Sequence, residues 1–253
     1  MTRTRPPLSL TTAAAAGAVF LLLPLVSLIE RTPWHALPRL LTSSSSLTAL
    51  RLSFECSLGA LALSLVVGVP LAWLLARVEF RGKSLLRAAV TLPLVLPPVV
   101  GGVALLLAFG RNGVVPLSLA FTTWGAILAE AFVALPFLVL AVEGALLAVD
   151  KRYDDVAATL GSSTTRTFFR VTLPLVLPAL AAGSALAWAR ALGEFGATIT
   201  FAGNLPGSTQ TLPLDVYLTL QNDPDGAVAL STLLLALSLV VLVAMRSRWR
   251  LTR

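Results

Sequence analysis

The chain has 253 residues, of which 57% are hydrophobic and only 12% are charged, and its formal net charge at pH 7 is +7. So apolar a composition excludes an ordinary water-soluble domain. The sequence contains one cysteine, Cys56, and one histidine, His35. Neither an intrachain disulfide nor a cysteine–histidine metal cluster is therefore expected.

Long apolar stretches account for most of the sequence. An apolar helix of ~20 residues crosses a hydrocarbon layer of ~30 Å, and the alternating pattern of a membrane β-barrel is absent. The sequence therefore predicts an all-α membrane protein with a single transmembrane domain over 1–253. Six transmembrane helices are expected, at approximately 10–29, 56–76, 88–110, 124–147, 171–196 and 226–245.

The first apolar stretch follows Arg3 and Arg5 and has the outline of a secretory signal. It is longer than the usual apolar region of a signal, and no A-x-A cleavage site follows it before Glu30. We expect an uncleaved first span, with a cleaved signal as the alternative.

The third and fifth stretches share an eight-residue repeat. Residues 90–97 and 171–178 both read VTLPLVLP. A proline in the first turn of a helix costs little, whereas a second proline frees a carbonyl and favours a bend. We expect two equivalent bent helices beside a pathway, with Pro93 and Pro97 as candidate pathway residues. Coincidence in a chain rich in Leu, Val and Pro is the alternative.

Two glutamates interrupt the fourth stretch. Ionisable side chains inside a span are costly and are therefore candidates for function. Glu130 and Glu143 lie thirteen residues apart, so a helical advance of ~100° per residue places them on different sides. We expect Glu143, near the cytoplasmic end, to be structural, and Glu130 to face protein or water.

The fifth stretch ends in a segment that combines charge with glycine. Arg190 and Glu194 lie four residues apart on one helical face and can pair, either for packing or in the pathway. Two glycines flank Phe195, whose ring could plug a narrow passage; close helix packing is the competing explanation. The candidate gate here comprises Arg190, Gly193, Glu194, Phe195, Gly196 and Thr198.

Residues 204–221 are too polar to lie in lipid. They include Pro206, Gly207 and Pro213, which favour turns. We expect an excursion on the outer side, in part re-entrant, before the last span.

Lysine and arginine in the connecting segments predict the orientation. With the N-terminus inside, fourteen of the 19 basic residues lie on the cytoplasmic side and only Arg31, Arg39, Arg51 and Arg111 lie outside. Both termini are therefore expected to be cytoplasmic. Topology accounts for the basic excess, and no nucleic-acid partner is expected.

A polar segment, 150–173, separates the fourth and fifth stretches. It contains D-V-A at 155–157, a glycine at 161 and V-T-L-P at 171–174. Gly161 can end a short helix in a left-handed conformation, and Ser162 or Ser163 can start another. A groove in a partner protein could hold such a helical knuckle.

The spacing of this segment resembles the EAA loop of ABC-importer permeases, which reads E-A-A, three residues, G, nine residues, I-x-L-P. Asp155 stands for the glutamate, Val156 for the first alanine and Val171 for the isoleucine. The residues that match directly are Ala157, Gly161, Leu173 and Pro174. The resemblance implies that these seven residues couple the chain to an ATPase.

Two further segments, 189–217 and 92–102, are similar to molybdate permeases, and the likeness covers most of 50–245. It implies a type I permease that carries molybdate or tungstate across the inner membrane of a prokaryote by alternating access. The implied partners are a second copy of the chain in a homodimer, two ATPase subunits, an extracytoplasmic oxyanion-binding protein and membrane lipid. No G-x-x-x-x-G-K-[ST] motif occurs, so MgATP is expected to be used by the separate ATPase. We expect no catalytic residue, no metal and no cofactor in this chain.

Three alternatives remain open. A sulfate permease shares the GEFGA segment, and competition between labelled molybdate and sulfate would separate the two. A membrane-embedded enzyme could use Glu130 or Glu194, but the chain offers no partner base, nucleophile cluster or metal set. A passive channel needs no ATPase-docking loop, so co-purification with an ATPase would exclude it.

Overall fold

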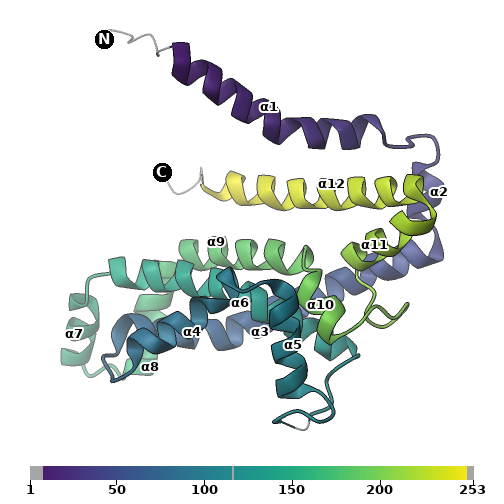
Figure 1. Ribbon diagram of the computed structural model, residues 1–253. Coiled ribbons are helices and arrows are strands. Elements are labelled where there is room, and N and C mark those ends of the chain that lie inside the picture. Colours follow the sequence, from purple (N-terminus) through teal and green to yellow (C-terminus); the bar gives the residue numbers. More distant parts are fainter. Residues whose placement is uncertain (1–7, 116, 250–253) are drawn as a thin grey trace.

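The computed structural model describes residues 8–115 and 117–249, and all regular elements within them are helices (Figure 1). The helices are α1 (Leu8–Glu30), α2 (Leu37–Leu41), α3 (Ser44–Arg77), α4 (Lys83–Val95), α5 (Pro98–Phe109), α6 (Thr123–Ala148), α7 (Arg152–Thr159), α8 (Thr164–Thr167), the π-helix η1 (Phe168–Thr172), α9 (Leu173–Leu192), α10 (Gly196–Phe201), α11 (Leu212–Asn222) and α12 (Pro224–Trp249). Four arginines used for the expected orientation, Arg3, Arg5, Arg250 and Arg253, lie outside the described residues.

Five helical segments of the described part are long and apolar enough to cross a membrane: α1, α3, α6, the run Thr164–Leu192, and α12. A shorter apolar helix, Pro98–Phe109, adds to them. The expected all-α membrane fold is confirmed. The helix α3 begins well before the expected start at 56, since Ser43 caps it by accepting a hydrogen bond from the Ser46 amide.

The expected third span, 88–110, is two helices and not one. The helix α4 ends at Val95 and α5 begins at Pro98, with Leu96 and Pro97 extended (ψ 130° and 129°). A proline disfavours the helical conformation of the residue before it. Pro97 therefore disfavours a helical conformation at Leu96, and Pro98 disfavours one at Pro97. The two consecutive prolines thus interrupt the helix.

The second copy of the repeat behaves differently, so the expected equivalence of the two copies is wrong. The run Thr164–Leu192 is helical throughout, and Pro178 lies inside α9. Pro178 is followed by Ala179 and not by another proline. The span also ends earlier than the expected 196, because the helix stops at Leu192 and α10 starts anew at Gly196.

The core of the molecule lies where α3, α6 and α9 pack together. Alanines make up half of the buried residues in this cluster, among them Ala60 and Ala72 of α3, Ala134 of α6 and Ala187 of α9, and leucines and valines make up the rest. Small residues let helix backbones approach closely, which is the usual way that helices associate in a membrane. The helix α6 is the most enclosed of the long helices.

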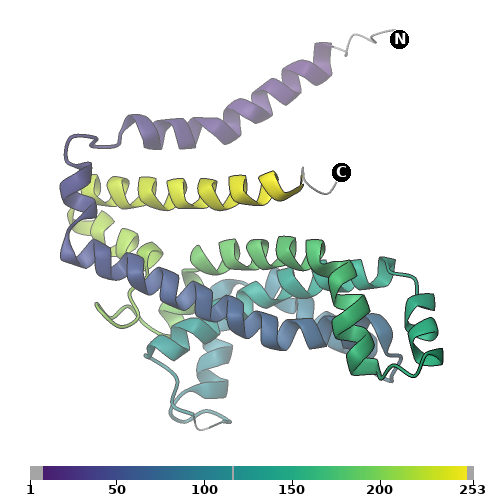
Figure 2. The same cartoon turned by 180° about the vertical axis from the view of Figure 1, so that it is seen from behind.

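The helices α1 and α12 lie beside this core and not within it (Figures 1 and 2). None of the apolar window of α1 is buried. A hydrogen bond of 2.8 Å between the Thr32 and Thr232 hydroxyls joins the end of α1 to α12. The side chains of α1 are therefore free to face lipid or another chain.

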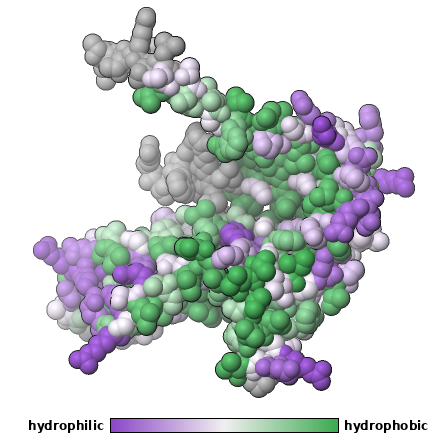
Figure 3. Space-filling view, viewed as in Figure 1, coloured by the Kyte–Doolittle hydropathy of each residue, from purple (hydrophilic) through white to green (hydrophobic). Residues whose placement is uncertain are grey.

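Polar and apolar residues separate along the molecule. In Figure 3, hydrophilic residues gather at the end that carries α7 and α8 and at the opposite end near α2, with hydrophobic residues between them. This banding is the pattern expected of a chain that spans a bilayer.

Candidate functional site

The segment 150–173 folds as two short helices joined by a tight turn. The helix α7 ends near Gly161, whose φ is +77°. The Gly161 amide donates to the Ala158 carbonyl (3.0 Å) and the Ser162 amide to the Ala157 carbonyl (3.0 Å). This pattern closes a helix through a left-handed residue, so the expected conformation of Gly161 is confirmed.

Ser163 starts the second helix, as the sequence predicts. Its side chain accepts a hydrogen bond from the Arg166 amide at 3.4 Å. The helix then passes through the π-helical turn 168–172 into α9. A π-turn is rare and often marks a functional position; the sequence carried no signal for it.

One face of this segment is apolar and turned outward. Leu160 is 81% exposed, and Tyr153, Val156 and Phe169 are each more than half exposed. Asp155 is also exposed, whereas Ala157 is half-buried. Exposed apolar side chains gathered on a polar end of the molecule are typical of a protein–protein contact.

The remaining residues of the expected loop pattern lie where the segment enters the membrane domain. Val171 belongs to the π-helix, Leu173 begins α9, and Pro174 lies in the first turn of α9. Val171 and Leu173 are half-buried. The pattern 155–174 therefore includes both an exposed part and an anchored part.

The anchor of the segment is Asp154, which sequence reasoning missed. Its Oδ1 accepts a hydrogen bond from the Thr172 hydroxyl (3.1 Å), and its Oδ2 lies 3.4 Å from Nε of Arg77. Helical spacing held a weak signal: 154, 157 and 158 share one face of α7, and two of them are alanines. Asp154, which shares a face with these alanines, is therefore the aspartate that turns toward Arg77 and Thr172.

A cavity of about 110 Å³ lies beside Asp154. Its walls come from the end of α3, from α7, and from the α8–η1 turn. The lining residues are Trp73, Arg77, Asp154, Ala158, Ser162, Thr164, Thr167, Phe168 and Thr172. The segment is therefore not tightly packed against α3.

The second candidate region is the junction between α9 and α10. Arg190 and Glu194 form an ion pair of 2.6 Å, as expected from their spacing. Glu194 is only 1% exposed, and its second oxygen accepts a hydrogen bond from the Ala197 amide (2.9 Å). Glu194 therefore also satisfies a free amide at the start of α10.

The two glycines of this junction have different surroundings. A Cβ on Gly196 would lie 2.8 Å from Cβ of Pro98, so α10 touches the start of α5 directly. A Cβ on Gly193 would meet only a carbonyl oxygen at 3.7 Å. Close packing thus applies to Gly196 alone.

Phe195, Thr198 and the prolines complete the candidate gate. The Phe195 ring lies 5.2 Å from the ring of Tyr217, on α11. Thr198 is fully buried, and its hydroxyl has no hydrogen-bond partner among the described residues. Pro97 lies beside the contact between Gly196 and α5, whereas Pro93 lies one turn earlier, inside α4.

The two glutamates of α6 are both buried but differ in their partners. Glu143 pairs with Arg87 of α4 (2.5 Å) and so joins α4 to α6, which agrees with a structural role. Glu130 is almost completely buried, and its Oε2 has no hydrogen-bond partner in the described part. None of the ion pairs among the described residues includes Glu130.

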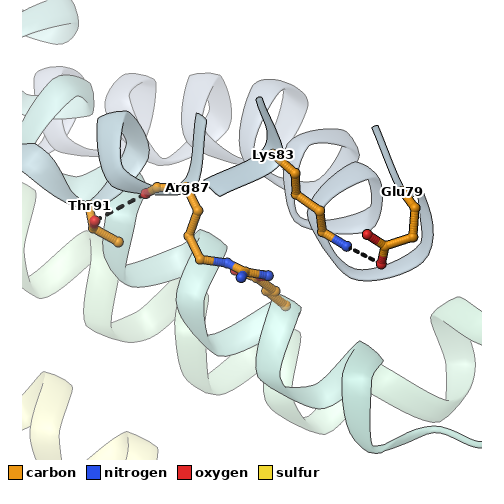
Figure 4. Close-up of polar contacts among 5 residues, drawn as sticks. Glu79, Lys83, Arg87 and Thr91 are labelled. Atoms are coloured by element: carbon orange, nitrogen blue, oxygen red, sulfur yellow. Dashed lines mark hydrogen bonds and ion pairs between the residues drawn. The ribbon is translucent and has the colours of Figure 1, made fainter. Parts of the chain in front are cut away.

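The start of α4 carries a second ion pair, in which Glu79 is exposed and Lys83 is largely buried. Lys83 points toward Glu79 at 2.7 Å, and Arg87 follows one turn later, where its carbonyl accepts from the Thr91 hydroxyl (3.0 Å) (Figure 4). The hydrogen bond from Lys83 lowers the pKa of the Glu79 carboxyl. Because Glu79 is exposed, water screens this pair strongly.

Metal binding has no support in the described residues, among which no three His, Cys, Asp or Glu side chains lie close enough to hold an ion. Cys56 is buried and unpaired.

Comparison with known proteins gives relatives that cover nearly the whole chain. The chain is 48% identical over 242 residues to the molybdenum transport system permease protein ModB of Mycobacterium tuberculosis, covering 93% of this chain and 92% of the relative. It is 36% identical over 235 residues to the sulfate transport system permease protein CysT of Synechococcus elongatus, covering 88% and 84%.

Solved structures share the fold. The crystal structure of a bacterial ABC transporter involved in the import of alginate matches with a TM-score of 0.70 at 19% identity, covering 96% of both chains. A bacterial alginate ABC transporter in complex with an alginate pentasaccharide-bound periplasmic protein matches with a TM-score of 0.68 at 17% identity, covering 93% of this chain and 92% of that chain.

A family model described as "Binding-protein-dependent transport system inner membrane component" matches residues 68–249, which include the segment 150–173 and the α9–α10 junction. The chain belongs to this family of transport permeases and is a multi-pass protein of the inner membrane.

Proposed function

We propose that the chain is the permease subunit of an ATP-driven importer that carries molybdate, or the closely similar tungstate, into the cytoplasm. The identity of 48% to a molybdenum permease over 93% of the chain carries this proposal. The lower identity of 36% to a sulfate permease makes sulfate the second candidate.

The segment 150–173 is the proposed coupling loop. The residues proposed to couple the chain to the ATPase are Asp155, Val156, Ala157, Gly161, Val171, Leu173 and Pro174. Exposed apolar side chains around Val156 and Leu160 support a contact in which α7 lies in a groove of an ATPase subunit. The continuous helical run from Thr164 to Leu192 supports transmission of the movement into the membrane.

The proposed complex holds two copies of this chain, two ATPase subunits and an extracytoplasmic binding protein. The similarity to an alginate transporter that was crystallised with a periplasmic protein supports the last partner. The ATPase subunits use MgATP, and this chain performs no covalent chemistry. Exposed apolar side chains of α1 support contact with lipid.

The proposed pathway passes the α9–α10 junction and the break between α4 and α5. A tetrahedral oxyanion needs hydrogen-bond donors and positive charge, and Arg190 supplies both. Because Glu194 neutralises Arg190 in the present conformation, the pathway would not hold the anion tightly. The proposed pathway residues are Pro93, Pro97, Arg190, Gly193, Glu194, Phe195, Gly196 and Thr198.

Both termini are proposed to be cytoplasmic. The first described turns of α1 and the last described turns of α12 lie toward the end that carries α7 and α8 (Figure 1). If the coupling loop faces the cytoplasm, this arrangement puts both ends of the chain on the same side.

Reconstitution tests the proposed function. The purified complex of permease, ATPase and binding protein is placed in vesicles, and uptake of labelled molybdate is measured with and without ATP. ATP-dependent uptake that excess tungstate suppresses and excess sulfate does not is the expected result. Suppression by sulfate at equal concentration would favour the sulfate permease instead.

The same preparation distinguishes an ATP-driven permease from a passive channel. Stoichiometric co-purification of an ATPase contradicts a passive channel, as does the absence of uptake without ATP. Asp155→Lys, which reverses a charge on the proposed docking face, should uncouple ATP hydrolysis from uptake while the protein remains in the membrane. Normal uptake in this variant would contradict the assignment of the coupling loop.

A further inference from the structure

Asp154 touches two helices at once, and neither contact belongs to the loop pattern. We propose that Asp154 is a positioning residue that links the coupling loop to α3 through Arg77, in addition to its link to α9 through Thr172. The inference rests on the proposed function, because it assigns the route by which the movement of the loop reaches the membrane domain.

The link to α3 depends on Arg77, in the last turn of that helix. The Arg77 side chain is only 7% exposed. Its Nη1 donates to the Val149 carbonyl at the end of α6 (3.2 Å), and its Nε lies 3.4 Å from the Asp154 carboxylate. Arg77 thus joins the ends of α3 and α6 to the first turn of α7.

The link to α9 runs through Thr172, which ends the π-helical turn. Thr172 is buried, and its hydroxyl donates to Asp154 at 3.1 Å. The two ends of the loop are therefore fastened to each other by one carboxylate. Movement of α7 must act on α3 and α9 together as long as these contacts persist.

The contact with Arg77 is incomplete in the present conformation. Nε and Nη2 of Arg77 are buried and make no hydrogen bond to any described residue, although Asp154 is close. A buried donor without a partner is costly, whereas an arginine and a carboxylate can form two parallel hydrogen bonds. A small approach of α7 to α3 would form them, and the adjoining cavity of about 110 Å³ leaves room for that approach.

The helix α3 can carry such a movement to the far side of the membrane. It runs along the whole body of the molecule, from α2 to the end with α7 and α8 (dark blue in Figure 2). Ser57 of α3 accepts a hydrogen bond from the Trp188 indole of α9 (3.0 Å), and Ser53 accepts one from the Leu212 amide (2.6 Å). The outer end of α3 is thus bonded to α9 and to the start of α11.

The linkage is tested in the complete complex with a fluorescent label at the outer end of α3. Leu47, which is exposed, is replaced by cysteine and labelled, with the native Cys56 replaced by alanine. Binding of ATP should change the emission of the label. Asp154→Asn keeps an acceptor for Thr172 but loses the charge that faces Arg77, and it should reduce the change by about tenfold.

Two controls test whether the effect is specific to the contact between Asp154 and Arg77. Glu79→Gln removes the same kind of charge at an exposed residue on the same side, and its response should match that of the unmodified complex. The double variant Asp154→Asn with Arg77→Gln should respond like Arg77→Gln alone, since both changes break one linkage. Additive effects would contradict a shared path.

An unchanged response of assembled Asp154→Asn complexes would overturn the inference, and so would an unmodified complex whose label does not respond to ATP. If Asp154→Asn fails to assemble, Thr172→Val, which removes only the hydroxyl contact, should still lower the response; an unchanged response there overturns the inference. If Asp154→Asn lowers the response to ATP while the unmodified complex takes up no molybdate, the linkage is supported and the proposed substrate is contradicted.

Discussion

Glu194 is held by two contacts of different origin. The pair with Arg190 follows from the spacing of four residues on one helical face, so the sequence predicted it. The hydrogen bond from the Ala197 amide exists only because the helix stops at Leu192 and a new one begins. Removing Arg190 would leave the buried Glu194 carboxylate without its cation, which costs about 3–5 kcal/mol, so the junction depends on this pair whatever its role in the pathway.

The glycines of the GEFGA segment permit a matched comparison. Gly196→Leu should distort the contact between α10 and α5, because a Cβ there would lie 2.8 Å from Pro98. Overpacking costs about 1–3 kcal/mol, and we expect a lower melting temperature and little uptake. Both are measured in purified complex at equal amounts.

Gly193→Leu is the control for that variant. Gly193 is exposed and its Cβ position is open, so the change in stability should stay within about 0.5 kcal/mol. Full uptake by Gly196→Leu would mean that the contact with Pro98 has no part in transport. Because Gly193 is one of the proposed pathway residues, a stable Gly193→Leu protein should lose uptake, and full uptake by it would exclude Gly193 from the pathway.

The burial of Asp215 predicts that the stability of the protein depends on pH. It lies outside the candidate spans, and burial raises the pKa of its carboxyl, with the hydrogen bond from Thr219 opposing in part. A folded-state pKa above the unfolded value gives stability at low pH that is lost as the pH rises through the folded pKa. Asp215→Asn should therefore raise the melting temperature at neutral pH.

The difference between Asp215→Asn and the unmodified protein should disappear below the ordinary aspartate pKa of about 3.9. Thermal unfolding followed across this pH range measures it. A difference that persists in acid would show that the substitution acts through packing and not through ionisation.

At the scale of elements, we expect the turn at Gly161 to be the most sensitive point of the proposed coupling loop. A φ of +77° is costly for a residue with a Cβ, by about 1–2 kcal/mol, and proline cannot adopt it. Gly161→Pro should abolish uptake while the protein still inserts in the membrane. Uptake, ATP hydrolysis and membrane content are measured together.

Gly144→Ala serves as the control, because it replaces a glycine whose position requires no special backbone conformation. Gly144 lies inside α6 with open space around it, so alanine should stabilise that helix by up to about 1 kcal/mol. Normal coupling in Gly161→Pro would refute the role of the turn.

The repeat VTLPLVLP shows how one residue outside a motif changes its structure. Identical sequences end α4 in one copy and continue through the π-turn into α9 in the other. The difference comes from Pro98, which keeps Pro97 out of the helical region. The match of eight residues predicted equivalent helices, but the residue that follows each copy, Pro98 in one and Ala179 in the other, makes the two structures differ.

At the scale of the whole molecule, the proposed orientation predicts which residues are accessible from outside. In a chain with Cys56 replaced by alanine, Leu205→Cys should react with an impermeant thiol reagent added to intact cells, because this exposed residue belongs to the outer turn. Arg81→Cys, in the turn between α3 and α4, should react only after the membrane is opened. The reverse pattern would invert the topology.

Much of the architecture could be predicted from the sequence, because the length and apolar character of a membrane-spanning helix are set by neighbouring residues. Apolar length predicted the long helices, and Gly161 followed by a serine predicted the turn within the segment 150–173. The segment 204–221 was predicted as polar, but the burial of Thr209 and Thr211 was not, because burial depends on residues distant in the chain.

The sequence by itself determined that the chain is helical, that it spans a membrane and where its polar loop lies, because helix length, charge and turn residues act over a few neighbouring positions. Only the tertiary structure decided that Asp154 and not Asp155 turns toward Arg77, that Gly196 and not Gly193 is packed against α5, and that α4 is separate from α5. Each of these depends on which surfaces meet when the helices pack, and that is a property of the whole chain.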